Sequence, residues 1–133
     1  MKQEEILKLA FTAMNNAYAP YSKYKVGACV LAKDGNYFLG ANVENASFGA
    51  TNCAERNAIF AAYSYGYRKK DIEAVAIVSN GERLAAPCGI CRQVLSELIN
   101  QDCPIILSNG QQTDVKTISE LLPMQFGEED LKK

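Results

Sequence analysis

The chain has 133 residues, 48% of them hydrophobic, which is enough apolar material for the core of one ordinary domain. Its 14 basic and 15 acidic side chains give a formal net charge of -1, so neither a basic surface nor a nucleic-acid partner is expected. Charges interrupt the N-terminal segment and no stretch reaches membrane-spanning length, which predicts no membrane partner and a cytoplasmic location. In a reducing cytosol, clustered cysteines such as these favour metal binding or catalysis over disulfides. Because the chain has no histidine, a zinc site would have to use cysteine or carboxylate groups.

Hydrophobic periodicity predicts a helix, followed by a hairpin, in the first third of the chain. Apolar side chains over residues 6–18 repeat at helical spacing, and this helix is expected to end before Pro20. Strand patterns over 25–33 and 37–43 flank Asp34-Gly35-Asn36, a turn signal in which glycine supplies a positive φ angle.

The rest of residues 1–133 continues as part of the same single domain, with helix and strand patterns in alternation. These elements are a helix over 53–65, a buried strand over 74–79, a helix entered at Pro87, a buried strand over 104–107, an edge strand over 114–117 and a helical turn over 119–122. The order α-β-β-α-β-α-β-β-α predicts an α/β layered domain, in which a mixed sheet of about five strands has helices on both faces.

Two short segments carry the candidate chemistry. Cys53-Ala54-Glu55 begins one predicted helix and Pro87-Cys88-Gly89-Ile90-Cys91 begins another, and a helix N-terminus favours the thiolate form that binds zinc. Cys88 and Cys91 are three residues apart and face the same way, whereas Cys53 and Glu55 are two apart and point in different directions. We therefore expect Cys53, Cys88 and Cys91 to bind one Zn2+ and Glu55 to lie beside it.

Three protein ligands leave one tetrahedral position for water, which distinguishes a catalytic zinc from a structural one. Three thiolates outweigh the charge of Zn2+, so a positive group is needed nearby. Arg56 and Arg92 each directly follow one of the two cysteine segments. Both are predicted to donate hydrogen bonds to the thiolates.

A zinc ligand with a glutamate two residues on, followed by Pro-Cys-x-x-Cys, is the signature of the zinc-dependent base deaminases, including a three-cysteine variant. Beyond it, the chain resembles the small homotetrameric cytidine deaminases in AYAPYSKYKVGA, GANVENASFG, NCAERNAIF, APCGICRQVLSEL and LLPMQFGEEDL. The resemblance implies a cytidine deaminase-like fold and hydrolytic deamination of free cytidine and 2'-deoxycytidine in pyrimidine salvage. It also implies one zinc ion per subunit and a homotetramer whose subunits share active sites.

The same resemblance implies a set of substrate contacts. They are Asn42 and Glu44 at the ribose hydroxyl, Ala46 and Phe48 at the 5' end of the sugar, Tyr24 on the base, Ala54, and Phe126 in the pocket of a neighbouring subunit. Tyr24 stands where the family more often has phenylalanine, and Phe48 where it more often has tyrosine. We therefore expect no polar contact from position 48.

Glu55 is expected to move protons from the attacking water to N3 of the pyrimidine and then to the leaving amine, with burial holding its pKa high. Three alternatives stay open at this point. In a non-catalytic zinc module, Cys29 or Cys103 would supply a fourth thiolate, although each alone is more typical of core packing. A deaminase of blasticidin S is disfavoured by Asn42 and Glu44. A deaminase of bases within RNA or DNA is disfavoured by the balanced charge.

Overall fold

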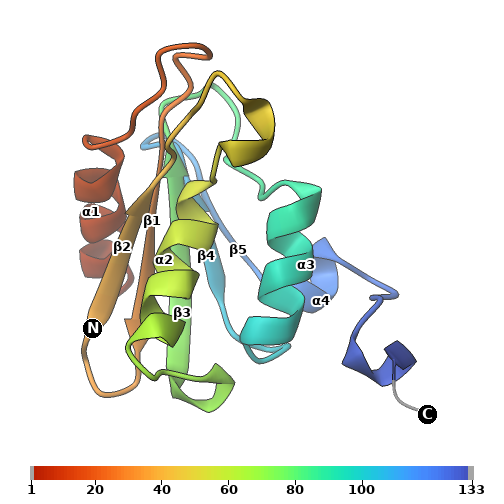
Figure 1. Cartoon of the computed structure of the whole chain (residues 1–133). Helices are drawn as coiled ribbons and strands as arrows, with labels where there is room; N and C mark the ends of the chain where they lie inside the picture. Colours follow the sequence, from red (N-terminus) through yellow and green to blue (C-terminus); the bar gives the residue numbers. More distant parts are fainter. Residues whose placement is uncertain (1, 132–133) are drawn as a thin grey trace.

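Five strands form one mixed sheet at the centre of the molecule, and helices cover both of its faces (Figure 1). The structure is a computed structural model that describes residues 2–131. The strands are β1 (Val26–Ala32), β2 (Tyr37–Ala41), β3 (Ile72–Ser79), β4 (Ile105–Ser108) and β5 (Thr113–Lys116). They lie in the order β2-β1-β3-β4-β5, in which β3 and β4 are parallel and the other neighbours antiparallel.

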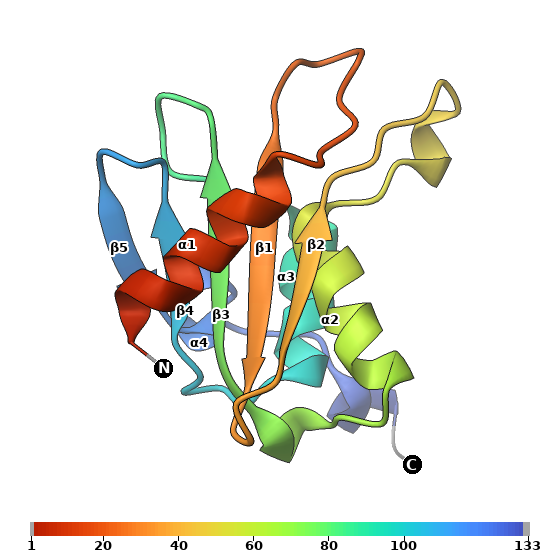
Figure 2. The same cartoon turned by 90° about the vertical axis from the view of Figure 1, so that its left-hand side faces the viewer.

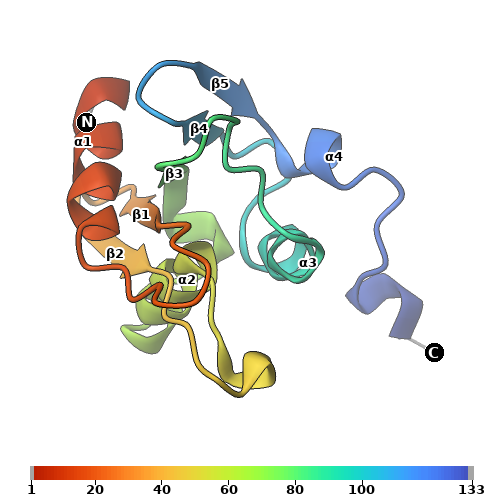
Figure 3. The same ribbon diagram turned by 90° about the horizontal axis from the view of Figure 1, so that it is seen from above.

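The helices divide between the two faces of the sheet. Helix α1 (Gln3–Met14) lies across one face (Figure 2), while α2 (Ala54–Ser64) and α3 (Gly89–Leu98) lie on the other (Figure 3). Helix α4 (Ile118–Leu121) lies beside α3, and three short 3-10 turns complete the described elements: η1 (Phe48–Ala50), η2 (Lys69–Asp71) and η3 (Glu128–Leu131). The predicted fold class and the predicted order of helices and strands are confirmed.

Burial along the strands follows from these two helical layers. All seven residues of β1 are buried, as expected for a central strand covered on both faces, whereas only one residue of β2, at the sheet edge, is buried. Gly40 on β2 permits a close approach of α2, because a Cβ atom there would lie 2.3 Å from the carbonyl oxygen of Ala54. The first turn of α2 is therefore seated directly against the sheet.

The end of α1 differs from the prediction that its helix continues to residue 18. The helix ends at Met14, and Tyr18 instead forms a bridge with Val43. The Tyr18 amide donates to the carbonyl of Asn42, and the Tyr18 carbonyl accepts from the amide of Glu44, each at 2.9 Å. These distant partners satisfy the backbone groups that a longer helix would have used. Among the described helices, none combines the length and the apolar character needed to cross a bilayer.

Candidate functional site

Cys53 and Cys88 occupy equivalent positions, each immediately before a helix. Their backbones are extended, and their carbonyls accept the first helical hydrogen bonds of α2 and α3, from Asn57 and Arg92 respectively. Neither side chain caps its helix, so both sulfurs remain available as ligands. The two helices begin at the same end of the sheet (Figure 1), which brings their first turns together.

The three predicted zinc ligands form one cluster. The sulfur of Cys88 lies 3.8 Å from that of Cys53 and 3.5 Å from that of Cys91, and all three sulfurs lie within 4.8 Å of one another. Tetrahedral zinc with Zn–S bonds of about 2.3 Å places two sulfurs about 3.8 Å apart. This donor set therefore fits one zinc ion. Among residues 2–131, no other group of three or more cysteine or carboxylate side chains converges in this way.

The remaining two cysteines are buried away from this cluster. Cys29 lies on β1 in the apolar cluster beneath α1, and Cys103 lies before β4 in the apolar cluster on the opposite face of the sheet. Burial raises the pKa of each thiol to about 12, so both stay protonated at neutral pH. The alternative of a closed four-thiolate zinc module is therefore wrong for the described chain.

The surroundings of Cys53 favour its negatively charged form, which is the form that binds a cation. Contact with the Cys91 thiol, together with the Arg56 guanidinium, lowers the pKa of Cys53 to about 5 although burial opposes this change. Arg56 donates from Nη2 to the sulfur of Cys53 at 3.3 Å. Its Nε atom is buried and has no hydrogen-bond partner within residues 2–131. The lowered pKa favours the thiolate form of Cys53, and Arg56 makes the sulfur contact predicted for it.

Arg92 does not make the thiolate contact predicted for it in the part of the chain that the structure describes. Its Nε donates to the carbonyl of Pro87 at 2.7 Å, and its Nη1 donates to the carbonyl of Leu121 at 2.6 Å. The guanidinium therefore donates to two backbone carbonyls, and one of these belongs to Pro87, the residue directly before Cys88. Arg92 thus fixes the segment that presents Cys88 and ties it to the end of α4.

Glu55 lies in the first turn of α2 and is only 5% exposed. Burial, with the adjacent negative charge of Cys53 adding to it, raises the pKa of its carboxyl group to about 7. Glu55 is not part of the cysteine cluster, in agreement with its predicted place beside the ion. A carboxyl group with this pKa can accept and release a proton near neutral pH.

A cavity of about 160 Å³ opens beside the cysteines. It is lined by Tyr24, Val26, Asn42, Thr51, Asn52, Cys53, Ala54, Glu55, Ala85, Ala86 and Cys88. The structure thus brings three predicted substrate residues, Tyr24, Asn42 and Ala54, together with Glu55 and two of the zinc ligands. Five further residues that line this cavity were not predicted from the sequence: Val26, Thr51, Asn52, Ala85 and Ala86. Asn52 directly precedes Cys53, so adjacency to the cysteine motif was the signal available for it.

Asn42 and Glu44 hold the segment that leads into β1. The Asn42 side chain accepts from the amide of Val26 at 2.9 Å and donates to the carbonyl of Tyr24 at 2.8 Å. Glu44 accepts from the amides of Tyr21 and Ser22 and from the Ser22 hydroxyl, and the last contact chiefly lowers its pKa. Both side chains therefore shape the wall that carries Tyr24. Their contact with ribose stays a prediction.

Three other predicted substrate residues lie at the surface and do not line this cavity. Ala46 is exposed, Phe48 is 81% exposed and Phe126 is 59% exposed. Within the described chain, the Phe48 and Phe126 side chains are thus mostly exposed to solvent. Their roles at the sugar and in a neighbouring subunit therefore stay predictions.

The sequence is similar to those of known deaminases. Residues 1–106 match the family model described as the cytidine and deoxycytidylate deaminase zinc-binding region. The chain belongs to this family. A cytidine deaminase from Halalkalibacterium halodurans is 48% identical over 133 residues, covering 98% of each chain, and one from Sporosarcina psychrophila is 42% identical over 132 residues, covering 98% of this chain and 96% of that one.

Solved structures of deaminases share the fold as well as the sequence. The crystal structure of cytidine deaminase from Burkholderia pseudomallei matches with a TM-score of 0.91 at 44% identity, covering 95% of this chain and 100% of that one. The matched zinc-binding region includes Cys53, Cys88 and Cys91. This deaminase therefore uses one zinc ion, and the cluster of three sulfurs is compatible with holding it.

Proposed function

We propose that this deaminase hydrolyses free cytidine and 2'-deoxycytidine to uridine and 2'-deoxyuridine with release of ammonia, as in pyrimidine salvage. The observation that carries the proposal is the placement of a buried carboxyl group, Glu55, beside three converging sulfurs at one small cavity. The substrate class is supported by the relatives at 48% and 42% identity, which are cytidine deaminases.

Zinc held by the three cysteines would supply a Lewis acid that brings the pKa of a water molecule toward neutrality. Glu55 then accepts a proton from the attacking water and delivers it to N3 of the pyrimidine, which makes C4 electrophilic. Once the water oxygen has bonded to C4, the same carboxylate takes the proton of the new C4 hydroxyl group and gives it to the exocyclic amine. The C4–N bond then breaks, C4 becomes a carbonyl and ammonia leaves. A pKa of about 7 suits both transfers, because the two protonation states of Glu55 are similarly populated near neutral pH.

Arg56 offsets the negative charge that accumulates at the cysteines. Three thiolates and one Zn2+ carry a net charge of about -1, which opposes loss of a proton from nearby water. The hydrogen bond from Arg56 to Cys53 disperses part of that charge. Arg56 therefore supports the reaction through a zinc ligand, without contact with the substrate.

The opposite wall of the cavity binds the nucleoside in this proposal. Tyr24 packs its ring on the base, and Asn42 and Glu44 bind the ribose hydroxyl. Support comes from the cavity, which Tyr24 and Asn42 line together with Glu55, and from the hydrogen bond that joins Glu44 to the segment carrying Tyr24. Recognition of the ribose would select a nucleoside over a free base.

We also propose that the active sites are shared within a homotetramer. Phe48, Met124 and Phe126 expose large apolar side chains, and Met124 is fully exposed. Apolar surface of this kind is favourable to bury in an interface. In this arrangement Phe126 of one subunit covers the cavity of another, and Ala46 and Phe48 reach the sugar.

The proposal is tested by incubating purified protein with cytidine, following the ultraviolet change and ammonia release, and measuring zinc in the same sample. We expect turnover together with about one zinc ion per chain. Full zinc occupancy without turnover of cytidine or deoxycytidine would overturn the proposed substrate class. Sedimentation analysis of the same sample tests the tetramer separately.

A further inference from the structure

Tyr24 lies in a segment that has no regular secondary structure. Residues 21–25 belong to no helix or strand, and Lys23 adopts a φ angle of +62°, in the left-handed region that disfavours side chains other than glycine, asparagine and aspartate. The ring of Tyr24 is 41% exposed and nevertheless forms part of the wall of the substrate cavity. Besides the local hydrogen bond from its own amide to Oγ of Ser22 at 3.0 Å, the position of Tyr24 therefore depends on contacts from other parts of the fold.

One of these contacts comes from Asn80, directly after β3. Its side-chain oxygen accepts from the amide of Lys25 at 3.0 Å, and its side-chain nitrogen donates to the carbonyl of Lys23 at 3.3 Å. The backbone amide of Asn80 also donates to the carbonyl of Lys25 at 3.2 Å. A single residue thus binds both chain neighbours of Tyr24 and holds the left-handed turn at Lys23.

The second contact comes from Gly81 and acts on the ring itself. A Cβ atom at Gly81 would lie 2.8 Å from Cε1 of Tyr24, so the ring occupies the space that any larger residue would need. Gly81 does not have a left-handed φ angle, and an alanine there would therefore press on the ring without straining its own backbone. The side chain of Asn109 holds this loop in place by donating to the carbonyls of Gly81 and Glu82.

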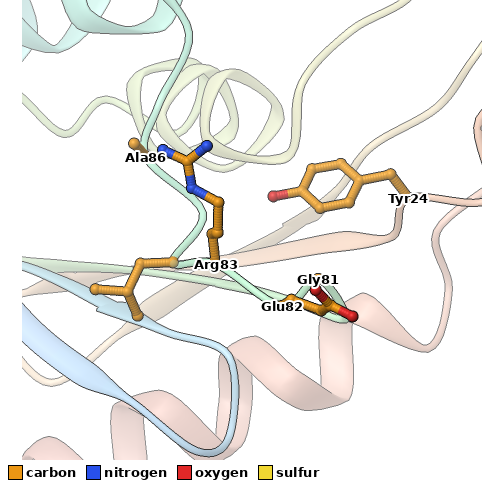
Figure 4. A pocket seen from close by; sticks show the side chains of 6 residues that line it. Tyr24, Gly81, Glu82, Arg83 and Ala86 are labelled. Carbon is orange, nitrogen blue, oxygen red and sulfur yellow. The ribbon is translucent and has the colours of Figure 1, made fainter.

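The ring of Tyr24 lines two hollows. One is the substrate cavity, and the other is an open hollow of about 510 Å³ that Gly81, Glu82 and Arg83 also line (Figure 4). Because the second hollow is open, the ring has space to swing away from the substrate cavity. The contacts from Asn80, to the residues on either side of Tyr24, and from Gly81, to the ring, oppose this movement.

We propose that Asn80 and Gly81 are positioning residues, which hold the ring of Tyr24 at the wall of the substrate cavity for stacking on the pyrimidine. This inference rests on the proposed function. Neither residue lines the substrate cavity or belongs to the cysteine cluster. Both act through Tyr24, and their effect is on binding of the nucleoside rather than on zinc or proton transfer.

The test compares Gly81→Ala and Asn80→Ala with the wild-type enzyme in kcat and KM for cytidine, zinc content and melting temperature. Stacking of a base on an aromatic ring contributes enough to binding that its disturbance should raise KM about threefold to tenfold. We expect kcat to change by less than about twofold and zinc content to stay the same, because Glu55 and the cysteines keep their contacts.

Three further variants make the result specific. In a Tyr24→Ala background, Gly81→Ala should cause no additional rise in KM. Asn80→Asp keeps the acceptor for the Lys25 amide and should restore part of the loss. Asn36→Ala removes an exposed asparagine with two side-chain hydrogen bonds at the opposite end of the β1–β2 hairpin and should leave KM unchanged.

A wild-type KM in Gly81→Ala overturns the inference, and so does an equal rise in KM with and without the Tyr24 ring. Failure of the proposed function gives a different result, because the wild-type enzyme itself would then not turn over cytidine. A loss of zinc or of kcat in Gly81→Ala with KM unchanged would also contradict a role through Tyr24.

Discussion

The two sides of the substrate cavity are built by contacts of different range. On the reactive side, Cys88 and Cys91 are three residues apart, and Glu55 and Arg56 lie two and three residues after Cys53. On the binding side, Tyr24 is held by hydrogen bonds between residues 16 to 57 positions apart in the chain. Chemistry is thus encoded in short motifs, whereas the wall that selects the substrate depends on the assembled sheet.

The largest expected effect lies on the reactive side, where Glu55→Gln keeps the shape of the side chain but removes the proton carrier. We expect kcat for cytidine to fall roughly a thousandfold while zinc content stays unchanged. Glu73→Gln, on an exposed residue of β3, is the matched control and should retain full activity. Turnover within about tenfold of wild type in Glu55→Gln would remove the assigned role.

The pH dependence should report the same carboxyl group. Burial raises the pKa of Glu55 to about 7, and the ionised form is the one that accepts the first proton. Activity should therefore rise with pH up to about 7, and kcat/KM should fall about tenfold for each unit below it, measured over a range in which the enzyme stays folded. Tyr24→Ala should lower kcat/KM without moving this midpoint. A profile that is flat down to pH 5 would contradict the assignment.

Arg56→Gln tests whether a positive charge near the cysteines strengthens zinc binding, because it removes the charge and leaves all three cysteines unchanged. Loss of the hydrogen bond to Cys53 should weaken zinc binding about tenfold to a hundredfold, measured by competition with a chelator. Arg68→Gln is a suitable control, since Arg68 donates to the carbonyls of Tyr63 and Tyr67. Equal zinc affinity in both variants would show that Arg56 contributes only to packing.

The smallest effect is expected on the binding side, from Asn42→Ala. This change leaves the Val26 amide and the Tyr24 carbonyl without their partner, which should lower the free energy of unfolding by about 1–3 kcal/mol. KM for cytidine should rise several-fold while zinc content and the pH midpoint stay as in wild type. Denaturant unfolding and steady-state kinetics measure the two effects separately. A change in zinc content would mean that the two sides of the cavity are not independent.

The same difference in range explains what could be predicted from the sequence. Hydrophobic periodicity and turn residues are local, so the order of helices and strands was predictable. The convergence of Cys53, Cys88 and Cys91 was predictable for another reason, because their motifs together form the signature of the zinc-dependent base deaminases. The end of α1 was not predictable in this way, because the backbone of Tyr18 pairs with residues 42 and 44. The carbonyl partners of Arg92 and the contacts of Asn80 with Lys23 and Lys25 likewise join segments that no local pattern relates.

The positions of Cys53 and Cys88 directly before α2 and α3 also affect how the molecule is held together. These residues are 35 positions apart, and all of β3 lies in the chain between them. An ion bound to both therefore acts as a cross-link that closes this loop and fastens the two helices on one face of the sheet to each other. Metal occupancy and folding of this half of the protein are consequently one coupled equilibrium, whereas the β1–β2 hairpin tip lies outside the closed loop.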